Sequence, residues 1–210
     1  MFHFLQSRLA VSLALALGGA LATQQVAAGS FCATPPQVQQ VREFYRNNAM
    51  TMPTIASRKL GLAEAIVVSG LPPEQAASAP GKDFALIWEA MTRWKEATFL
   101  IMKGANVFEV LSGIGKVARS KTSAYTNIEY VHPMRGHLRP DLYESIYAVS
   151  LPGKDGEAAR GILFYDAQGA SVFGVFMSGE TSPPASELAK FDEVMELVRS
   201  RAPVCGAPQS

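Results

Sequence analysis

The stretch Ala97–Leu111 reads ATFLIMKGANVFEVL and decides the fold class. Two runs rich in aromatic and branched side chains, Ala97–Met102 and Val107–Leu111, flank a short segment of turn residues, KGAN. This is the pattern of two antiparallel strands joined by a tight turn. The sequence therefore predicts a β-hairpin near the middle of the chain.

Further elements are predicted on both sides of this hairpin. Short strand-like runs, separated by turn signals, are Ala124–Ile128, Ser145–Leu151, Gly161–Tyr165 and Ser171–Phe176. Helical periodicity predicts a first helix that starts at Pro35, with Thr34 as its capping residue. It also predicts a helix capped by Asp83, over Phe84–Trp94, and three further helices over Thr54–Leu60, Leu62–Ser69 and Ala185–Arg199. Helices, then an antiparallel sheet, then a helix make an α+β domain.

The N-terminus has the three parts of a secretory signal peptide. A short segment with Arg8 precedes the apolar run Leu9–Ala22, and Val26-Ala27-Ala28 fits a cleavage site. The alternative is an uncleaved membrane anchor, but the run is shorter than the roughly 20 residues of a spanning helix. We expect residues 1–28 to be removed and residues 29–210 to form one periplasmic or secreted domain.

Composition limits the classes of partner. The chain has 210 residues, with 19 Lys and Arg against 18 Asp and Glu, and this near balance gives no electrostatic reason to expect nucleic acid. The two cysteines, Cys32 and Cys205, stand near opposite ends of the mature chain. In an oxidising compartment they favour a disulfide between the termini, and two free thiols are the alternative.

Three patterns are weighed and set aside. The two short helices around Gly61 resemble a helix-turn-helix, but local packing is the better interpretation for an exported neutral protein. The segment Gly113–Ala118 matches the dinucleotide pattern Gly-x-Gly-x-x-Ala, yet no helical pattern follows it, which favours a glycine-rich hairpin loop. Asp83, Glu89 and Glu96 are interpreted as solvated surface acids rather than a catalytic pair.

The segment 124–141 is the most informative for function. It contains both histidines of the mature chain, His132 and His137, together with two tyrosines and two arginines. Histidine, methionine and tyrosine ligate haem iron, and arginine suits the propionates. The alternative from the residues alone is a structural or solvent-facing histidine beside Gly136 in a hairpin.

A set of motifs in order resembles the ChuX/HutX family of haem-utilisation carrier proteins. The helix Ile87–Trp94, the hairpin from Ala97, and the closing strands from Gly161 to Phe176 resemble family elements. The most recognisable part is Tyr125–Ile128 followed by Met134–Leu138. The resemblance covers roughly residues 54–198.

The resemblance implies a split-barrel or saddle-like antiparallel sheet with flanking helices, and a homodimer. It also implies a non-catalytic protein that holds haem b and passes it between a donor and an acceptor protein. His137 matches the proposed haem-iron ligand, and Tyr125 matches an aromatic residue of the ligand region. Met102 stands where some members have a second histidine, and its alternative role is a core or edge-strand side chain. His132 has a counterpart in some members only.

Arg135 and Arg139 are the residues expected near the propionates. The chain departs from the family after its last strand, where Gly-Arg-Asp is replaced by the segment 177–181, MSGET. Two other functions stay open at this point. One is an exported module on the same scaffold that binds another apolar ligand or a partner protein, and the other is a haem-degrading enzyme.

Overall fold

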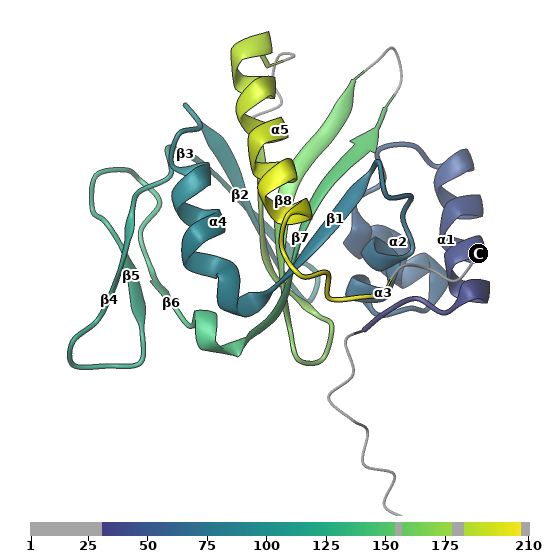
Figure 1. The fold of residues 1–210 in the computed structure, drawn as a ribbon, viewed down its shortest axis with the longest axis horizontal. Coiled ribbons are helices and arrows are strands. Elements are labelled where there is room, and N and C mark those ends of the chain that lie inside the picture. Colours follow the sequence, from purple (N-terminus) through teal and green to yellow (C-terminus); the bar gives the residue numbers. More distant parts are fainter. Residues whose placement is uncertain (1–30, 154–156, 178–182, 207–210) are drawn as a thin grey trace, which may run out of the picture.

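The computed structural model describes residues 31–153, 157–177 and 183–206 (Figure 1). The predicted signal peptide and residues 178–181 of the departing segment lie outside these ranges. No helix of the described ranges is long and apolar enough to cross a membrane. The helices are α1 (Pro35–Asn47), α2 (Pro53–Leu60), α3 (Glu64–Ser69), α4 (Phe84–Met91) and α5 (Ala185–Arg199), with short 3-10 turns at Gly81–Asp83 and Pro140–Leu142.

The described strands form two antiparallel sheets. The larger sheet has the strand order β1-β7-β8-β9-β2-β3, and the smaller has the order β4-β5-β6. The strands of the larger sheet are β1 (Ala76–Pro80), β7 (Tyr143–Pro152), β8 (Ala158–Asp166), β9 (Ser171–Met177), β2 (Ala97–Lys103) and β3 (Asn106–Ser112). Those of the smaller sheet are β4 (Val117–Arg119), β5 (Thr126–Ile128) and β6 (His137–Leu138). The predicted α+β class is confirmed.

The predicted hairpin is β2–β3. Met102 lies opposite Val107, and Lys103 lies opposite Asn106. Gly104 has φ of 60°, a left-handed conformation that glycine adopts without a Cβ clash. The two-residue turn therefore uses its glycine where the backbone requires it.

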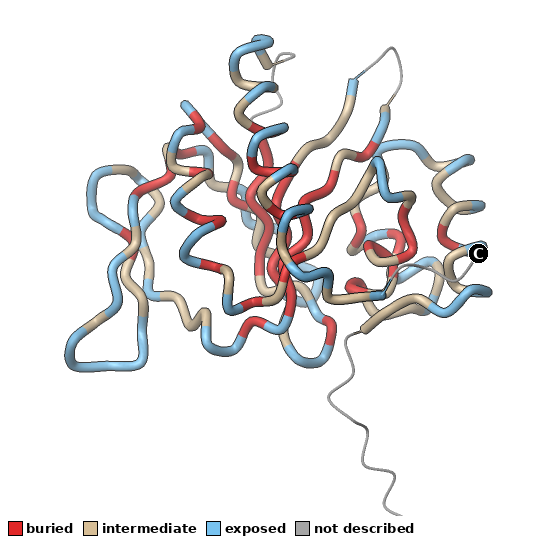
Figure 2. Tube along the Cα trace, in the orientation of Figure 1, coloured by how far each residue is buried: buried red, intermediate tan, exposed pale blue. Residues whose placement is uncertain are grey.

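The larger sheet buries side chains on both faces. On one face, α4 and α5 pack on strand residues such as Phe99 and Phe164, and Trp88 lies fully buried among them. On the other face, α1–α3 cover Tyr147 and Tyr165. Figure 2 shows the buried residues concentrated in the central strands and in the helix faces turned toward them. In Figure 1 the smaller sheet and the helices α1–α3 lie at opposite ends of the molecule.

The inner face of the smaller sheet packs against the hydrophobic core that lies between the larger sheet and helices α4 and α5. The buried side chain of Ile128 and the half-buried side chains of Val117 and Leu138 pack into that core. The indole Nε1 of Trp88 donates a hydrogen bond of 2.9 Å to the carbonyl of Gly115, just before β4. This sheet is therefore fixed on α4 by both apolar packing and a buried hydrogen bond.

Several predicted boundaries and roles are wrong. Helix α4 ends at Met91 rather than Trp94, and α3 begins at Glu64 rather than Leu62. Asp83 precedes α4 but makes no side-chain cap, because its carboxylate accepts hydrogen bonds from Arg201 at 2.9 and 3.3 Å. Strands β1, β4 and β6 were not predicted, since short runs of small or polar residues give a weak strand signal.

The glycine-rich segment Gly113–Ala118 is not a hairpin loop. It leads from β3 in the larger sheet into β4 in the smaller one, so no helix follows it. That topology does not match a dinucleotide-binding turn, which opens a helix.

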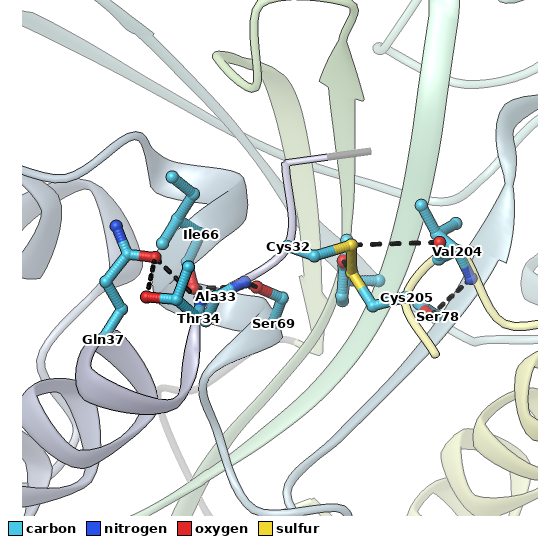
Figure 3. Close-up of a disulfide and its surroundings, with 10 residues drawn as sticks. Cys32, Ala33, Thr34, Gln37, Ile66, Ser69, Ser78, Val204 and Cys205 are labelled. Carbon is cyan, nitrogen blue, oxygen red and sulfur yellow. Dashed lines mark hydrogen bonds between the residues drawn. A yellow bond between two sulfur atoms is a disulfide. The ribbon is translucent and has the colours of Figure 1, made fainter. Parts of the chain in front are cut away.

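The predicted disulfide between Cys32 and Cys205 is present (Figure 3). The chain on both sides of it is held by hydrogen bonds: the Ala33 N–H donates to Ser69 Oγ at 2.8 Å, and the Val204 N–H donates to Ser78 Oγ at 3.1 Å. The disulfide closes a loop with a sequence separation of 173 residues. It therefore ties the segment before α1 to the segment after α5.

Replacing both cysteines, Cys32→Ser with Cys205→Ser, should lower the free energy of unfolding. The chain-entropy model gives about 5 kcal/mol for a loop of this length, and measured losses run from about 2 to 5 kcal/mol. Urea denaturation of the oxidised protein and the double variant measures the difference. A loss below about 1 kcal/mol would show that the cross-link does not restrict the unfolded chain as this model requires.

A buried carboxyl group lies between the α1–α3 helices and the sheet. Glu64 is 7% exposed, accepts a hydrogen bond of 2.6 Å from Thr54 Oγ1, and accepts another of 3.2 Å from the Tyr165 hydroxyl. Burial raises the pKa of Glu64, and this outweighs the opposing effects of the two hydrogen bonds and of Arg58. The folded state therefore binds a proton at this site more tightly than the unfolded chain does.

Because the folded pKa of Glu64 is raised, stability should fall as pH rises from its ordinary value of 4.5 through the folded pKa. The variant Glu64→Gln keeps groups that can pair with Thr54 and Tyr165 but does not titrate. We expect it to lose this downward slope, which reaches about 1.4 kcal/mol per pH unit at most. Urea denaturation between pH 4.5 and 7.5 measures it, with the exposed Glu109→Gln as control; equal slopes in all three proteins would contradict the assignment.

Candidate functional site

The outer face of the smaller sheet carries the predicted iron ligand. In the strand register, Asn127 of β5 lies opposite His137 of β6, and Ala118 of β4 lies on the other side of Asn127. Residues directly opposite each other in a sheet share a face. Because Ile128 and Leu138 point into the core, Asn127 and His137 point away from it, and the His137 side chain is exposed.

A hydrogen bond fixes the imidazole of His137. Its Nδ1 lies 2.7 Å from Oδ1 of Asn127. A carbonyl oxygen only accepts hydrogen bonds, so Nδ1 carries a proton and donates a hydrogen bond to Oδ1 of Asn127. Of the two neutral tautomers, the one with the proton on Nδ1 has its lone pair on Nε2, and that nitrogen can then ligate a metal.

Tyr125 and Arg139 complete the cluster around His137. The ring of Tyr125, which is 44% exposed, stands edge-on to the His137 ring with centroids 5.9 Å apart. The same Tyr125 ring also contacts Arg139, whose guanidinium lies 5.8 Å from the ring centroid. The structure thus brings together three of the predicted site residues on one exposed surface.

Arg139 is not a free cation. Its Nε and Nη2 donate to the two carboxylate oxygens of Asp141 at 2.9 and 2.7 Å. This bidentate pair raises the pKa of Arg139 and lowers the pKa of Asp141, with the hydrogen bonds as the main cause in both. A haem propionate at Arg139 would therefore have to share it with Asp141.

The other predicted site residues lie elsewhere. His132 is half-buried and its ring lies against Gly113, where an added Cβ would stand 2.6 Å from its Cε1 atom. Arg135 is exposed and stacks its guanidinium 5.4 Å from the ring centroid of Tyr130. Met102 belongs to the larger sheet, half-buried at the end of the β2–β3 hairpin.

Asn127 and Asp141 are the site residues that sequence reasoning missed. The signal for Asn127 was present, because alternation along a strand puts it on the same face as Tyr125. Its hydrogen bond with His137 depends on the register of β5 against β6. That register cannot be read from the sequence, because β6 has only two residues. Asp141 stands two residues after Arg139, a spacing that does not by itself indicate a bidentate pair.

Comparison with solved structures gives the same fold. A protein from Agrobacterium tumefaciens superposes with a TM-score of 0.66 at 26% identity, covering 78% of this chain and 92% of its own. A structure described as the heme binding protein ChuX has a TM-score of 0.66 at 16% identity, covering 76% and 99%.

Longer proteins share the fold over part of their length. Escherichia coli ChuS, described as a heme oxygenase, has a TM-score of 0.60 at 17% identity, covering 79% of this chain and 50% of its own. This chain therefore spans about half the length of that protein. None of the curated proteins compared with the chain matches it.

A family model described as haem utilisation ChuX/HutX matches residues 77–201, which is more than half of the sequence. The match begins in β1 and runs just past α5, so it contains both sheets and every residue of the His137 cluster. The chain belongs to the ChuX/HutX family of haem-utilisation proteins.

Proposed function

We propose that this protein binds haem b as cargo on the outer face of β4–β5–β6 and passes it on unchanged, with His137 as the iron ligand. The observation that carries the proposal is the hydrogen bond between His137 Nδ1 and Asn127 Oδ1. It favours one orientation of the exposed imidazole and engages Nδ1, which leaves Nε2 as the nitrogen available to the iron. Family membership supports haem as the ligand.

Tyr125 and the arginines have secondary roles in this proposal. The exposed ring of Tyr125 offers an apolar edge beside the porphyrin, and Arg139 offers a charge-assisted hydrogen bond to one propionate. Arg135 is exposed and is the group proposed for the second propionate, and its guanidinium lies over the ring of Tyr130 in the structure. His132 and Met102 are not retained as ligands, because one packs on Gly113 and the other lies in the larger sheet.

An exposed, one-sided site suits a carrier rather than an enzyme. One protein ligand on one face leaves the opposite axial position of the iron open to water or to a partner protein. Haem held in this way dissociates more readily than haem enclosed on both faces. The haem oxygenase among the structural relatives is 17% identical to this chain, a level at which only the fold is shared. Haem degradation is therefore a separate outcome of the haemin titration.

Haemin titration followed by absorption tests the proposal directly. We expect the purified protein to give a saturable Soret shift, and His137→Ala to weaken binding about 10-fold or more, because an axial bond is lost. Asn127→Ala should weaken haem binding by less than His137→Ala does, because it leaves the ligand in place and removes only the group that orients it. His132→Ala is the matched control and should bind as the parent protein does.

Two results would contradict this proposal. One is equal affinity of the parent and His137→Ala proteins, which would place the ligand elsewhere. The other is loss of the Soret band with a biliverdin-like product after a reductant is added, which would make the protein an enzyme.

We also propose that the protein is exported, and that residues 1–28 are its signal peptide. The support is the apolar N-terminal segment together with the Cys32–Cys205 disulfide, since disulfides persist in oxidising compartments. The mass of the protein recovered from the periplasm or medium should match residues 29–210 with one disulfide. Recovery of the full-length reduced chain from the cytosol alone would contradict export.

A further inference from the structure

A cavity of about 650 Å³ opens between helix α1, the segment that follows α3, and the end of strand β7. Helix α1 supplies most of its wall, and this helix lies at the end of the molecule opposite to the smaller sheet that carries His137 (Figure 1). Its wall includes side chains from all three segments, among them Val38, Arg42, Tyr45, Pro72, Gln75 and Pro152. All of these except Pro152 precede residue 77, where the family match begins.

Three residues of this wall each have a buried polar side-chain atom without a hydrogen-bond partner, and these atoms themselves expose almost no surface. They are Nε of Arg42, the hydroxyl oxygen of Tyr45 and Oε1 of Gln75. In the part of the chain that the structure describes, the fourth such atom is Nε1 of Trp94, so three of the four belong to residues that line this cavity. A buried polar group without a partner costs about 1–3 kcal/mol. A bound hydrogen-bond acceptor satisfies two of them, the Arg42 and Tyr45 groups, whereas Oε1 of Gln75 is itself an acceptor and needs a donor.

The available groups select an anion. Arg42 has no carboxylate partner among the ion pairs of the described residues, whereas Arg46, one turn further along α1, is paired with Glu43. Burial and the nearby Glu64 raise the pKa of Tyr45, so its hydroxyl stays protonated and can donate. A guanidinium and a phenol that both donate are suited to a carboxylate.

The rest of the wall selects an apolar body. Pro35, Val38, Pro72 and Pro152 present carbon surface around the polar groups. Sites for small molecules combine such walls with a few convergent polar groups. We propose that this cavity binds a small organic carboxylate with an apolar body, whose carboxylate accepts hydrogen bonds from Arg42 and Tyr45 after small side-chain rotations.

Isothermal titration with octanoate tests the proposal, and 1-octanol is the neutral control. Octanoate should bind saturably, and Arg42→Met should weaken it about 10-fold or more, since hydrogen bonds to charged groups contribute about 1.5–3 kcal/mol. Tyr45→Phe removes only the hydroxyl and should weaken octanoate by several-fold. Any binding of 1-octanol should not change in either variant.

Arg93→Met removes an exposed arginine that is paired with Glu193 away from the cavity, and this control should bind octanoate as the parent does. If circular dichroism shows that Arg42→Met does not fold, Tyr45→Phe decides. No saturable binding of octanoate, or equal binding by the parent and the folded variants, would overturn the proposal. Because no haem is used, this outcome is independent of the His137 site.

Discussion

The hydrogen bond from the Trp88 indole to the Gly115 carbonyl, within a core closed by Ile128, fixes how the smaller sheet faces solvent. Trp88 is fully buried on α4, so its N–H has to find a partner, and the backbone just before β4 supplies one. With the apolar face of β4–β6 held against α4, strand alternation leaves the opposite face outside. The exposure of His137 is therefore a consequence of core packing.

The same constraint explains the chemistry of the site. Asn127 and His137 lie opposite each other on the outer face, so the amide oxygen accepts a hydrogen bond from Nδ1–H of the imidazole, and in the neutral ring Nε2 keeps the lone pair. Arg139 and Asp141 form a bidentate ion pair beside Tyr125, so their two charges offset each other.

The local parts of this structure were predictable from the sequence. The β2–β3 hairpin has both its turn glycine and its alternating apolar side chains within 16 residues, and the last helix has a continuous apolar stripe. The Cys32–Cys205 bridge followed from having two cysteines in a chain with an export-like N-terminus. The features that were missed depend on distant partners. Asp83 binds Arg201 rather than capping its own helix, and Asn127 meets His137 only through the register of a two-residue strand.

The imidazole nitrogens of His137 can be observed directly in a ¹⁵N-labelled protein by NMR, with gallium protoporphyrin IX as a diamagnetic stand-in for haem. In the free protein, the account predicts that Nδ1 of His137 carries the proton and Nε2 does not. On adding the porphyrin, the Nε2 resonance of His137 should shift while both nitrogens of His132 stay in place. A proton on Nε2 of His137, or a shift at His132 with none at His137, would contradict the account.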